Sequence, residues 1–328
     1  MLNSDPEQII ISKILLIIRI YYFLLVKRND FASINLMNIP QSEKKQFQKK
    51  VLERYNANKR DLPWRKTIDP YKIMVSEVML QQTQVPRVIQ KFTRWMELRP
   101  TVNDLAIAPR ADVLREWSGL GFNRRAINLH EACKKISNDI FNAEFKIQNV
   151  KWNSSKKLWI MSYELWIHFF MSDYAYLRSL PGVWEYTANA ILAFAYNQEV
   201  PVMDINIKRV LLHTFQLPLD TPLFELQELA LSLVPIWQSR DRHNALMDYG
   251  SQVLHSRATW IQSTKQSTFK WSDREVRGRI MKQLAQNISL TVDSVQIQWP
   301  AKDIHTIIAT LMKDWLIVLQ WSKISIAI

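Results

Sequence analysis

A short apolar helix that carries one carboxylate constrains this chain more than any other feature of its sequence. Residues 71–84 are expected to be helical, and Glu77 lies in the middle of this stretch. At helical spacing its side chain has four neighbours, three of them apolar: Ile73, Met74, Leu80 and Gln81. The carboxyl group therefore points toward a core, where burial disfavours the ionised form and raises the pKa toward neutrality.

A carboxylic acid that stays protonated near neutral pH can serve as a general acid in catalysis. The segment S-E-V-M-L-Q-Q-T-Q-V-P (76–86) also suits a plainer interpretation, a helix glutamate that is paired with an arginine or points into water. Structural ion pairs place carboxylates in similar surroundings. The segment alone leaves both interpretations open.

Five blocks of the sequence resemble one known family. The run L-P-W-R-K-T-I-D-P-Y-K-I-M-V-S-E-V-M-L-Q-Q-T-Q-V-P (62–86) is similar to the MutY-type adenine DNA glycosylases of the helix-hairpin-helix (HhH-GPD) superfamily. Four further blocks follow in the family's order: W-S-G-L-G-F-N-R-R-A-I-N-L-H (117–130), L-P-G-V-W-E-Y-T-A-N-A-I (180–191), V-M-D-I-N-I-K-R-V-L (202–211) and M-D-Y-G (247–250).

The resemblance implies that two carboxyl groups share the chemistry. Glu77 would protonate an adenine leaving group and help to activate water, and Asp204 would stabilise the cationic sugar. Asp204 precedes a helical run, so cap bonds and the helix dipole are expected to lower its pKa; a plain N-cap is the alternative. Asn206 matches an asparagine that positions a carboxyl group or water.

Tyr186 bears on the type of reaction. Endonuclease III-type relatives carry a lysine at this position, whose amine attacks the sugar and leads to strand cleavage. A phenol cannot form that Schiff base. The resemblance therefore implies a monofunctional glycosylase with Tyr186 near the reacting sugar, whereas ordinary packing is the alternative role for this tyrosine.

Residues expected to contact DNA fall into three groups. Residues 180–191 resemble the family's hairpin, and the resemblance implies that backbone N–H groups of its turn, at Gly182, Val183 and Trp184, bind a phosphate. Gln82 and Phe122 match residues that wedge into the base stack around the flipped nucleotide. The third group is basic side chains that would contact phosphates: Arg124, Arg125, Lys208 and Arg209. The ordinary alternative for each is a charged side chain that is simply exposed to solvent.

Composition favours a polyanionic partner, because the chain has a formal net charge of +13 and a pI near 9.7. We expect a monomer that binds double-stranded DNA, without a membrane partner, in the cytoplasm at the nucleoid. The single cysteine, Cys133, excludes an internal disulfide and suits a reducing compartment. Many relatives hold a 4Fe–4S cluster on four cysteines after the M-D-Y-G block, but residues 251–268 contain none, so no cofactor is expected.

The helical patterns predict an all-α fold in which a two-lobed HhH-GPD glycosylase domain (37–265) precedes a small winged-helix-like domain (272–328). A plain helical cap is the alternative for the second domain. Residues 147–172 have no counterpart in the family and are expected to be an insertion of unknown role. Residues 1–36 form an apolar leader of uncertain status, for which a membrane anchor is the minority interpretation because two cations interrupt it. No Nudix-like domain is recognised, which leaves the preferred opposite base open.

Glycine is scarce, with five residues in the chain, whereas tryptophan occurs 13 times. Several tryptophans stand where a turn favours glycine, and a bulky residue at positive φ is an outlier. We hypothesise that the source organism reads UGA as glycine; a tryptophan-rich sequence is the alternative. The candidate positions are Trp184, Trp237, Trp260, Trp271, Trp299, Trp315 and Trp321.

The resemblance implies a monofunctional DNA glycosylase of base-excision repair, which removes adenine from A:G or A:8-oxoguanine mispairs by base flipping and acid-assisted hydrolysis of the N-glycosidic bond. Two alternatives stay open. One is a glycosylase of the same fold that acts on another damaged base, and the other is a catalytically silent DNA-binding protein.

Overall fold

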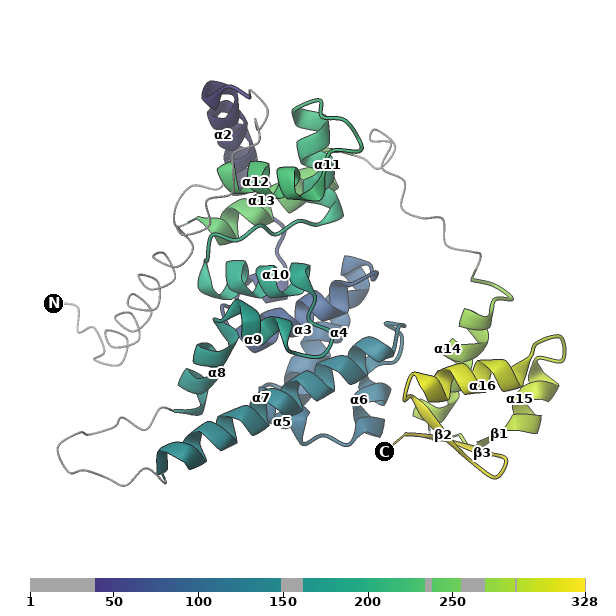
Figure 1. The fold of residues 1–328 in the computed structure, drawn as a ribbon. Coiled ribbons are helices and arrows are strands. Elements are labelled where there is room, and N and C mark those ends of the chain that lie inside the picture. The colour runs from purple at the N-terminus through teal and green to yellow at the C-terminus, as the bar shows by residue number, and fades with distance from the viewer. Residues whose placement is uncertain (1–38, 149–161, 234–237, 255–268, 287, 328) are drawn as a thin grey trace. The chain divides into compact units, whose positions relative to one another are not determined.

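The computed structural model describes residues 39–148, 162–233, 238–254, 269–286 and 288–327. All the elements below belong to one compact unit, residues 41–328. Two groups of helices form the lobes of the larger domain (Figure 1). The first group is η1 (Pro63–Arg65), α3 (Pro70–Leu80), α4 (Val85–Leu98), α5 (Val102–Ala106), α6 (Arg110–Trp117), α7 (Arg124–Gln148), α8 (Tyr163–Met171) and α9 (Tyr174–Arg178).

The second group comprises α2 (Gln41–Asn58), α10 (Glu185–Tyr196), α11 (Ile205–Thr214), α12 (Leu223–Ser232) and α13 (Ser239–Gln252). Helix α10 packs on α3 and α9 on one side and on α13 on the other, so it connects the two groups. This arrangement confirms the predicted two-lobed helical fold.

Helix α3 is the buried centre of the first lobe. Its N-cap, Asp69, accepts hydrogen bonds from the backbone N–H groups of Tyr71 and Lys72, and Pro70 occupies the first helical position. All but two of its residues are buried, as expected of a helix that is apolar all round. The helix ends at Leu80, earlier than predicted, because Gln82 adopts a left-handed φ of 55°.

Part of the predicted insertion contributes to the core. Residues 162–171 lie within the segment 147–172 that has no recognised counterpart, and they form helix α8 behind the N-cap Ser162. Its side chains Trp166, Ile167 and Met171 are buried in the main core. This stretch is therefore an integral element of the lobe, whereas residues 149–161 lie outside the described residues.

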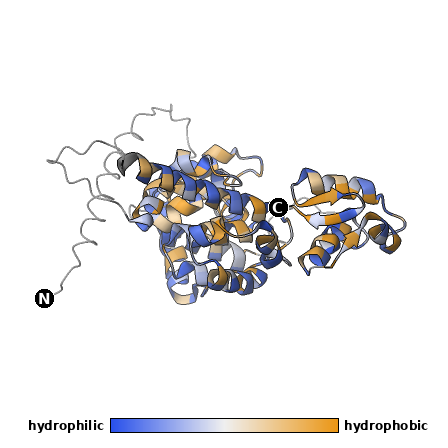
Figure 2. Ribbon diagram, turned by 90° about the horizontal axis from the view of Figure 1, so that it is seen from below, coloured by the Kyte–Doolittle hydropathy of each residue, from blue (hydrophilic) through white to orange (hydrophobic). Residues whose placement is uncertain are grey.

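The C-terminal elements have the predicted winged-helix-like topology. They follow in the order α14 (Asp273–Ala285), β1 (Leu290–Thr291), α15 (Val292–Gln298), α16 (Ile304–Lys313), β2 (Ile317–Gln320) and β3 (Lys323–Ile326). The strands form an antiparallel sheet of order β1-β3-β2. Hydrophobic and hydrophilic residues are interspersed along these helices (Figure 2). The sequence analysis predicted a winged-helix-like domain over these residues, but α15 and β1 are too short to leave a clear pattern of their own.

Three of the seven suspect tryptophans have left-handed backbones. Trp271, Trp315 and Trp321 have φ values of 64°, 56° and 60°, and their side chains are exposed. Trp184 and Trp299 do not fit the expectation, since their φ values are −86° and −135°. The remaining candidates, Trp237 and Trp260, lie outside the described residues.

None of the helices in the described ranges is long and apolar enough to cross a membrane. The apolar leader, residues 1–36, lies outside these ranges.

Candidate active site

A cleft of about 670 Å³ is lined by residues of both helical groups. Helix α3 contributes Glu77, α10 contributes Tyr186, and Asp204 and Asn206 come from the start of α11. The structure thus brings together all four residues that the sequence analysis assigned to catalysis. They are far apart in the chain. Helix α10 packs on α3, and α11 packs on α13, which in turn packs on α10.

Glu77 is a buried acid whose pKa is displaced upward. Its side chain is 5% exposed, and its Oε2 accepts a hydrogen bond of 3.0 Å from the hydroxyl of Tyr186. Burial raises the pKa of Glu77 from its usual 4.5 to about 7; the bond from Tyr186 opposes this shift, and the charge of Asp204 adds to it. The predicted rise toward neutrality agrees with this result, and the group can hold or release a proton near neutral pH.

Asp204 is fixed by cap bonds at the start of α11. Its Oδ1 accepts from the backbone N–H of Ile207 at 2.7 Å, and its Oδ2 accepts from Nδ2 of Asn206 at 2.7 Å. These bonds lower the pKa of Asp204, but burial raises it by more, so the net direction is upward. The expectation of a lowered pKa was wrong because it counted the cap and the helix dipole without desolvation.

A close backbone approach sets the position of Asn206. A Cβ atom added to Gly250 would lie 2.7 Å from the backbone oxygen of Asn206 and 2.9 Å from its Cβ. Helices α11 and α13 can therefore pack at this distance only with glycine in the M-D-Y-G block. Arg209 supports the same side chain, because its Nη1 donates to Oδ1 of Asn206 at 3.2 Å.

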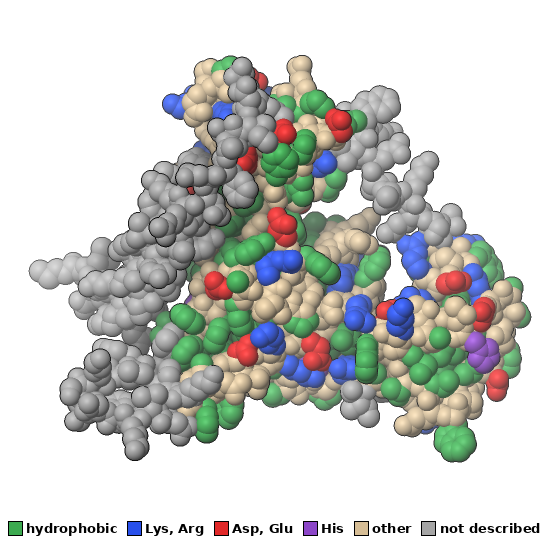
Figure 3. All heavy atoms as spheres, in the orientation of Figure 1, with side chains coloured by type: hydrophobic (Ala, Val, Ile, Leu, Met, Phe, Trp, Pro, Cys, Tyr) green, Lys and Arg blue, Asp and Glu red, His purple; other side chains and the backbone are tan. Residues whose placement is uncertain are grey.

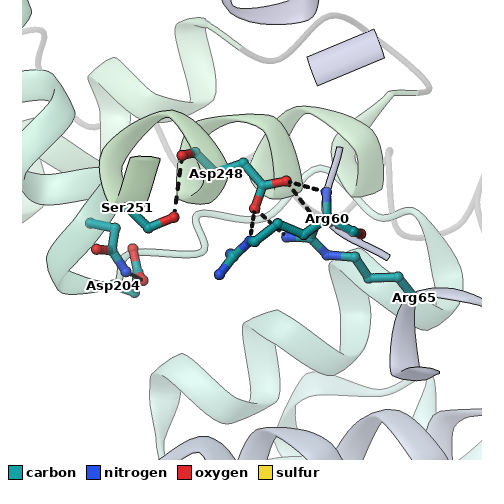
Figure 4. A network of polar contacts seen from close by, with 6 residues as sticks. Arg60, Arg65, Asp204, Asp248 and Ser251 are labelled. Carbon is teal, nitrogen blue, oxygen red and sulfur yellow. Dashed lines mark hydrogen bonds and ion pairs between the residues drawn. The ribbon is translucent and has the colours of Figure 1, made fainter. Parts of the chain in front are cut away.

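An ion-pair network that the sequence analysis missed borders the cleft (Figure 4). Arg65 donates to Asp248 through Nη1 and Nη2 at 2.8 and 2.9 Å, and Arg60 donates through its backbone N–H and Nε at 3.2 and 2.5 Å. Burial raises the pKa of Asp248, but the bonds and charges of Arg65 and Arg60 outweigh it and hold the pKa below its usual value. Both arginines line the cleft. Arg65 belongs to the L-P-W-R block and Asp248 to the M-D-Y-G block, but no local pattern indicates that the two side chains meet.

The predicted phosphate-binding turn lies between α9 and α10. Gly182 has a φ of 76°, and a Cβ there would lie 2.7 Å from Cβ of Asn128. The backbone N–H of Val183 bonds to the oxygen of Leu180 at 3.2 Å, which closes the turn. Trp184 is the N-cap of α10 and is exposed, so the start of this helix faces solvent.

The two predicted wedge residues both have left-handed backbones and exposed side chains. Gln82 has a φ of 55° and follows α3, and Phe122 has a φ of 47° and precedes α7. Phe122 is 47% exposed although it is a large apolar residue. Exposed apolar side chains on strained turns are candidates for contact with a partner.

The four basic residues divide into two kinds. Arg124 is exposed and Lys208 is half-buried, so both stay candidates for phosphate contact. Arg209 is buried against Asn206, and the guanidinium of Arg125 is surrounded by backbone carbonyls. These protein partners do not favour a role of Arg125 and Arg209 in binding phosphate, and the contacts expected of both residues stay a prediction. On the face in Figure 3, Lys and Arg side chains are interspersed with acidic ones.

The residues of this chain do not fit the iron–sulfur cluster that the resemblance to MutY-type proteins implies. Such a cluster needs four thiolates, and the whole chain has one cysteine. Cys133 is buried within α7, and burial raises the pKa of its thiol, which opposes the ligating thiolate form. Among the described residues no group of three or more His, Cys, Asp or Glu side chains is arranged to hold a metal ion.

The two-lobed helical fold, together with the family model and the relatives below, defines the class of this protein as a DNA glycosylase. The family model for the HhH-GPD superfamily base excision DNA repair protein matches residues 75–235, and the chain belongs to this family.

Similar proteins include the adenine DNA glycosylase of Mycolicibacterium smegmatis, which is 31% identical over 253 residues, 70% of this chain and 78% of that protein. The adenine DNA glycosylase of Rattus norvegicus is 36% identical over 219 residues, 63% of this chain and 38% of that protein. A solved structure of a thermostable thymine-DNA glycosylase superposes with a TM-score of 0.52 at 24% identity, over 66% of this chain and 90% of that one, and supports the fold.

Proposed function

We propose that this protein is a monofunctional adenine DNA glycosylase of base-excision repair, which removes adenine from A:G or A:8-oxoguanine mispairs. One observation carries the proposal: a protonatable Glu77 and a capped Asp204 line the same cleft, with Tyr186 bonded to Glu77. The similarity to named adenine DNA glycosylases supports the choice of adenine.

The chemistry follows from the two carboxyl groups. The target adenine leaves the duplex and enters the cleft, because its glycosidic bond is inaccessible within the base stack. Glu77 donates its proton to a ring nitrogen of the base while the bond between C1′ and the base breaks, with the electron pair leaving on the base. The sugar becomes an oxocarbenium ion, which ionised Asp204 stabilises. Water then adds to C1′ and returns a proton to Glu77.

The cleft also supports a reaction that stops at base removal. The side chain beside Glu77 is the phenol of Tyr186, and no lysine is among the described residues that line the cleft. Without an amine, no Schiff base forms on the sugar and the strand stays intact. Its product would be an abasic site that breaks only under alkali.

A strand-cleavage assay tests the proposal. Duplexes with adenine opposite guanine, 8-oxoguanine or thymine, and a duplex with thymine opposite guanine, are incubated with protein and then heated with or without alkali. We expect breaks only after alkali and only at adenine opposite guanine or 8-oxoguanine. Cleavage at thymine opposite guanine would favour a glycosylase for another base, and no cleavage of any duplex would favour a silent DNA-binding protein.

We further propose that the protein acts as a monomer on double-stranded DNA, without an iron–sulfur cluster, in the cytoplasm at the nucleoid. The formal net charge of +13 and the two lobes bordering one cleft support a duplex partner. Light scattering of the protein with a short duplex would show a mass of one chain per duplex. A mass of two chains would contradict the monomer.

A further inference from the structure

Arg125 connects two turns that are distant in sequence. Its Nη1 donates to the carbonyl oxygens of Val78 and Met79 at 2.8 and 3.1 Å, and also to that of Gln81. Three carbonyl oxygens at the end of α3 thus accept hydrogen bonds from Nη1 in place of the backbone N–H donors that a further helical turn would have provided. One end of the guanidinium therefore caps the helix that carries Glu77.

The other end of the same guanidinium binds the turn before α7. Nη2 donates to the backbone oxygens of Leu120 and Gly121 at 3.3 and 3.2 Å, and to Oγ1 of Thr83 at 3.1 Å. Its central carbon lies 5.4 Å from the ring centre of Trp117. A planar group with donors on both edges can bridge two turns in this way, whereas a lysine ammonium cannot.

Both bridged turns contain a strained residue that faces outward. Gln82 lies between two of the groups bound by Arg125, and the ring of Phe122 lies 5.5 Å from its guanidinium carbon. The left-handed φ values of Gln82 and Phe122, 55° and 47°, are unfavourable for such side chains and persist only where surrounding contacts impose them. The bonds to residues on either side of Gln82, and to the residues before Phe122, supply those contacts.

We propose that Arg125 is a positioning residue that locks Gln82 and Phe122 into one rigid wedge, so that both side chains enter the base stack together. The proposal rests on the proposed function for the use of the wedge. It assigns Arg125 no contact with DNA, since its Nη1 and Nη2 groups are taken up by protein oxygens. Preorganised wedge residues avoid the ordering cost of inserting two mobile side chains separately.

The test compares Arg125→Lys and Arg125→Met with Arg124→Met, which removes the neighbouring exposed charge. Single-turnover cleavage is measured on adenine in a mispaired duplex and on adenine opposite an abasic site, where the base is already unstacked. We expect both Arg125 variants to lose about 10- to 100-fold on the mispair and to retain nearly wild-type rates on the unstacked base. A loss that is equal on both substrates, or wild-type activity of Arg125→Lys, would overturn the proposal.

Binding and hydrogen exchange give readouts that do not depend on cleavage. Removing a phosphate contact lowers the slope of log affinity against log salt by about one, so we expect this change for Arg124→Met and no change for Arg125→Met. Amide exchange should accelerate at residues 81–83 and 120–122 in both Arg125 variants, while the first turns of α3 stay protected. A lowered salt slope for Arg125→Met, or unchanged amide exchange in the two Arg125 variants, contradicts the proposed wedge. If the wild type cleaves no duplex, the proposed function fails, but the exchange experiment still decides the role of Arg125.

Discussion

The hydroxyl of Tyr186 donates a 3.0 Å hydrogen bond to Oε2 of Glu77, although 109 positions separate the two residues in sequence. The bond joins α10 to α3 inside the cleft. It stabilises the ionised carboxylate and therefore opposes the effect of burial on the pKa of Glu77. The balance leaves the acid close to half-protonated at neutral pH, which suits a group that must donate a proton and later recover it.

The rate of base removal should fall as pH rises above about 7. Because the pKa of Glu77 is raised to about 7, the protonated acid predominates below this pH and decreases about tenfold per unit above it. Single-turnover rates on a mispaired duplex between pH 5 and 9 check this. A rate that stays constant up to pH 9 would contradict the role of Glu77 as the proton donor.

Glu77→Gln should lower the rate of base removal by about 100- to 10,000-fold, because the amide cannot donate the proton that the leaving base needs. Single-turnover rates at neutral pH measure the loss.

The same substitution should stabilise the fold at alkaline pH. Below pH 4.5 the acid is protonated in both states and the substitution changes little. Between 4.5 and 7 the unfolded chain releases the proton that the folded state keeps, so the wild type loses stability as pH rises. The full shift corresponds to about 3 kcal/mol above pH 7. Urea unfolding of the wild type and the variant at pH 4.5 and pH 8 measures the difference in free energy of unfolding. An equal difference at both pH values would refute the raised pKa of Glu77.

Tyr186→Phe should move the pH profile to higher pH. Without the hydroxyl, the carboxylate of Glu77 loses a bond that lowers its pKa, so the acid stays protonated further into the alkaline range. Tyr174→Phe on α9 is the matched control and should leave the profile where it is. The same rate series checks both variants, and a shift to lower pH would show that Tyr186 does not stabilise the carboxylate.

Asp248→Asn should destabilise the protein by about 3 to 5 kcal/mol, because it leaves Arg60 and Arg65 without their shared carboxylate partner. Asp241→Asn, on the exposed side of the same helix, is the control and should change stability little. Urea unfolding at neutral pH measures both. Similar stability of the two variants would mean that the network does not hold α13 to the segment around Arg65.

Trp321→Gly should stabilise the C-terminal domain by about 1 kcal/mol, because it relieves a left-handed φ of 60° on a fully exposed side chain. The residue begins the two-residue turn between β2 and β3, where positive φ is favoured. Trp299→Gly is the control and should destabilise, since that ring is buried. Thermal unfolding compares them. UGG codons at positions 271, 315 and 321 would end the idea that glycine belongs there.

Local patterns in the sequence predicted the elements that carry the site. The helix around Glu77 and the cap at Asp204 both follow from spacing and capping residues over a few positions. The raised pKa of Glu77 was also predictable, because its apolar neighbours at helical spacing already indicate burial. Short elements such as α15 left too weak a pattern.

Tertiary structure decided what depends on groups that meet across the fold. Nothing near Asp248 in sequence shows that it pairs with Arg65, and nothing near Arg125 shows that carbonyls of α3 surround it. The direction of the pKa shift of Asp204 needed the depth of its burial, which the cap alone does not reveal. The sequence thus determined the local conformation and the chemical groups, because these depend on neighbouring residues. Desolvation and long-range contacts determined the directions of their pKa shifts and their hydrogen-bond partners, because both depend on how helices pack.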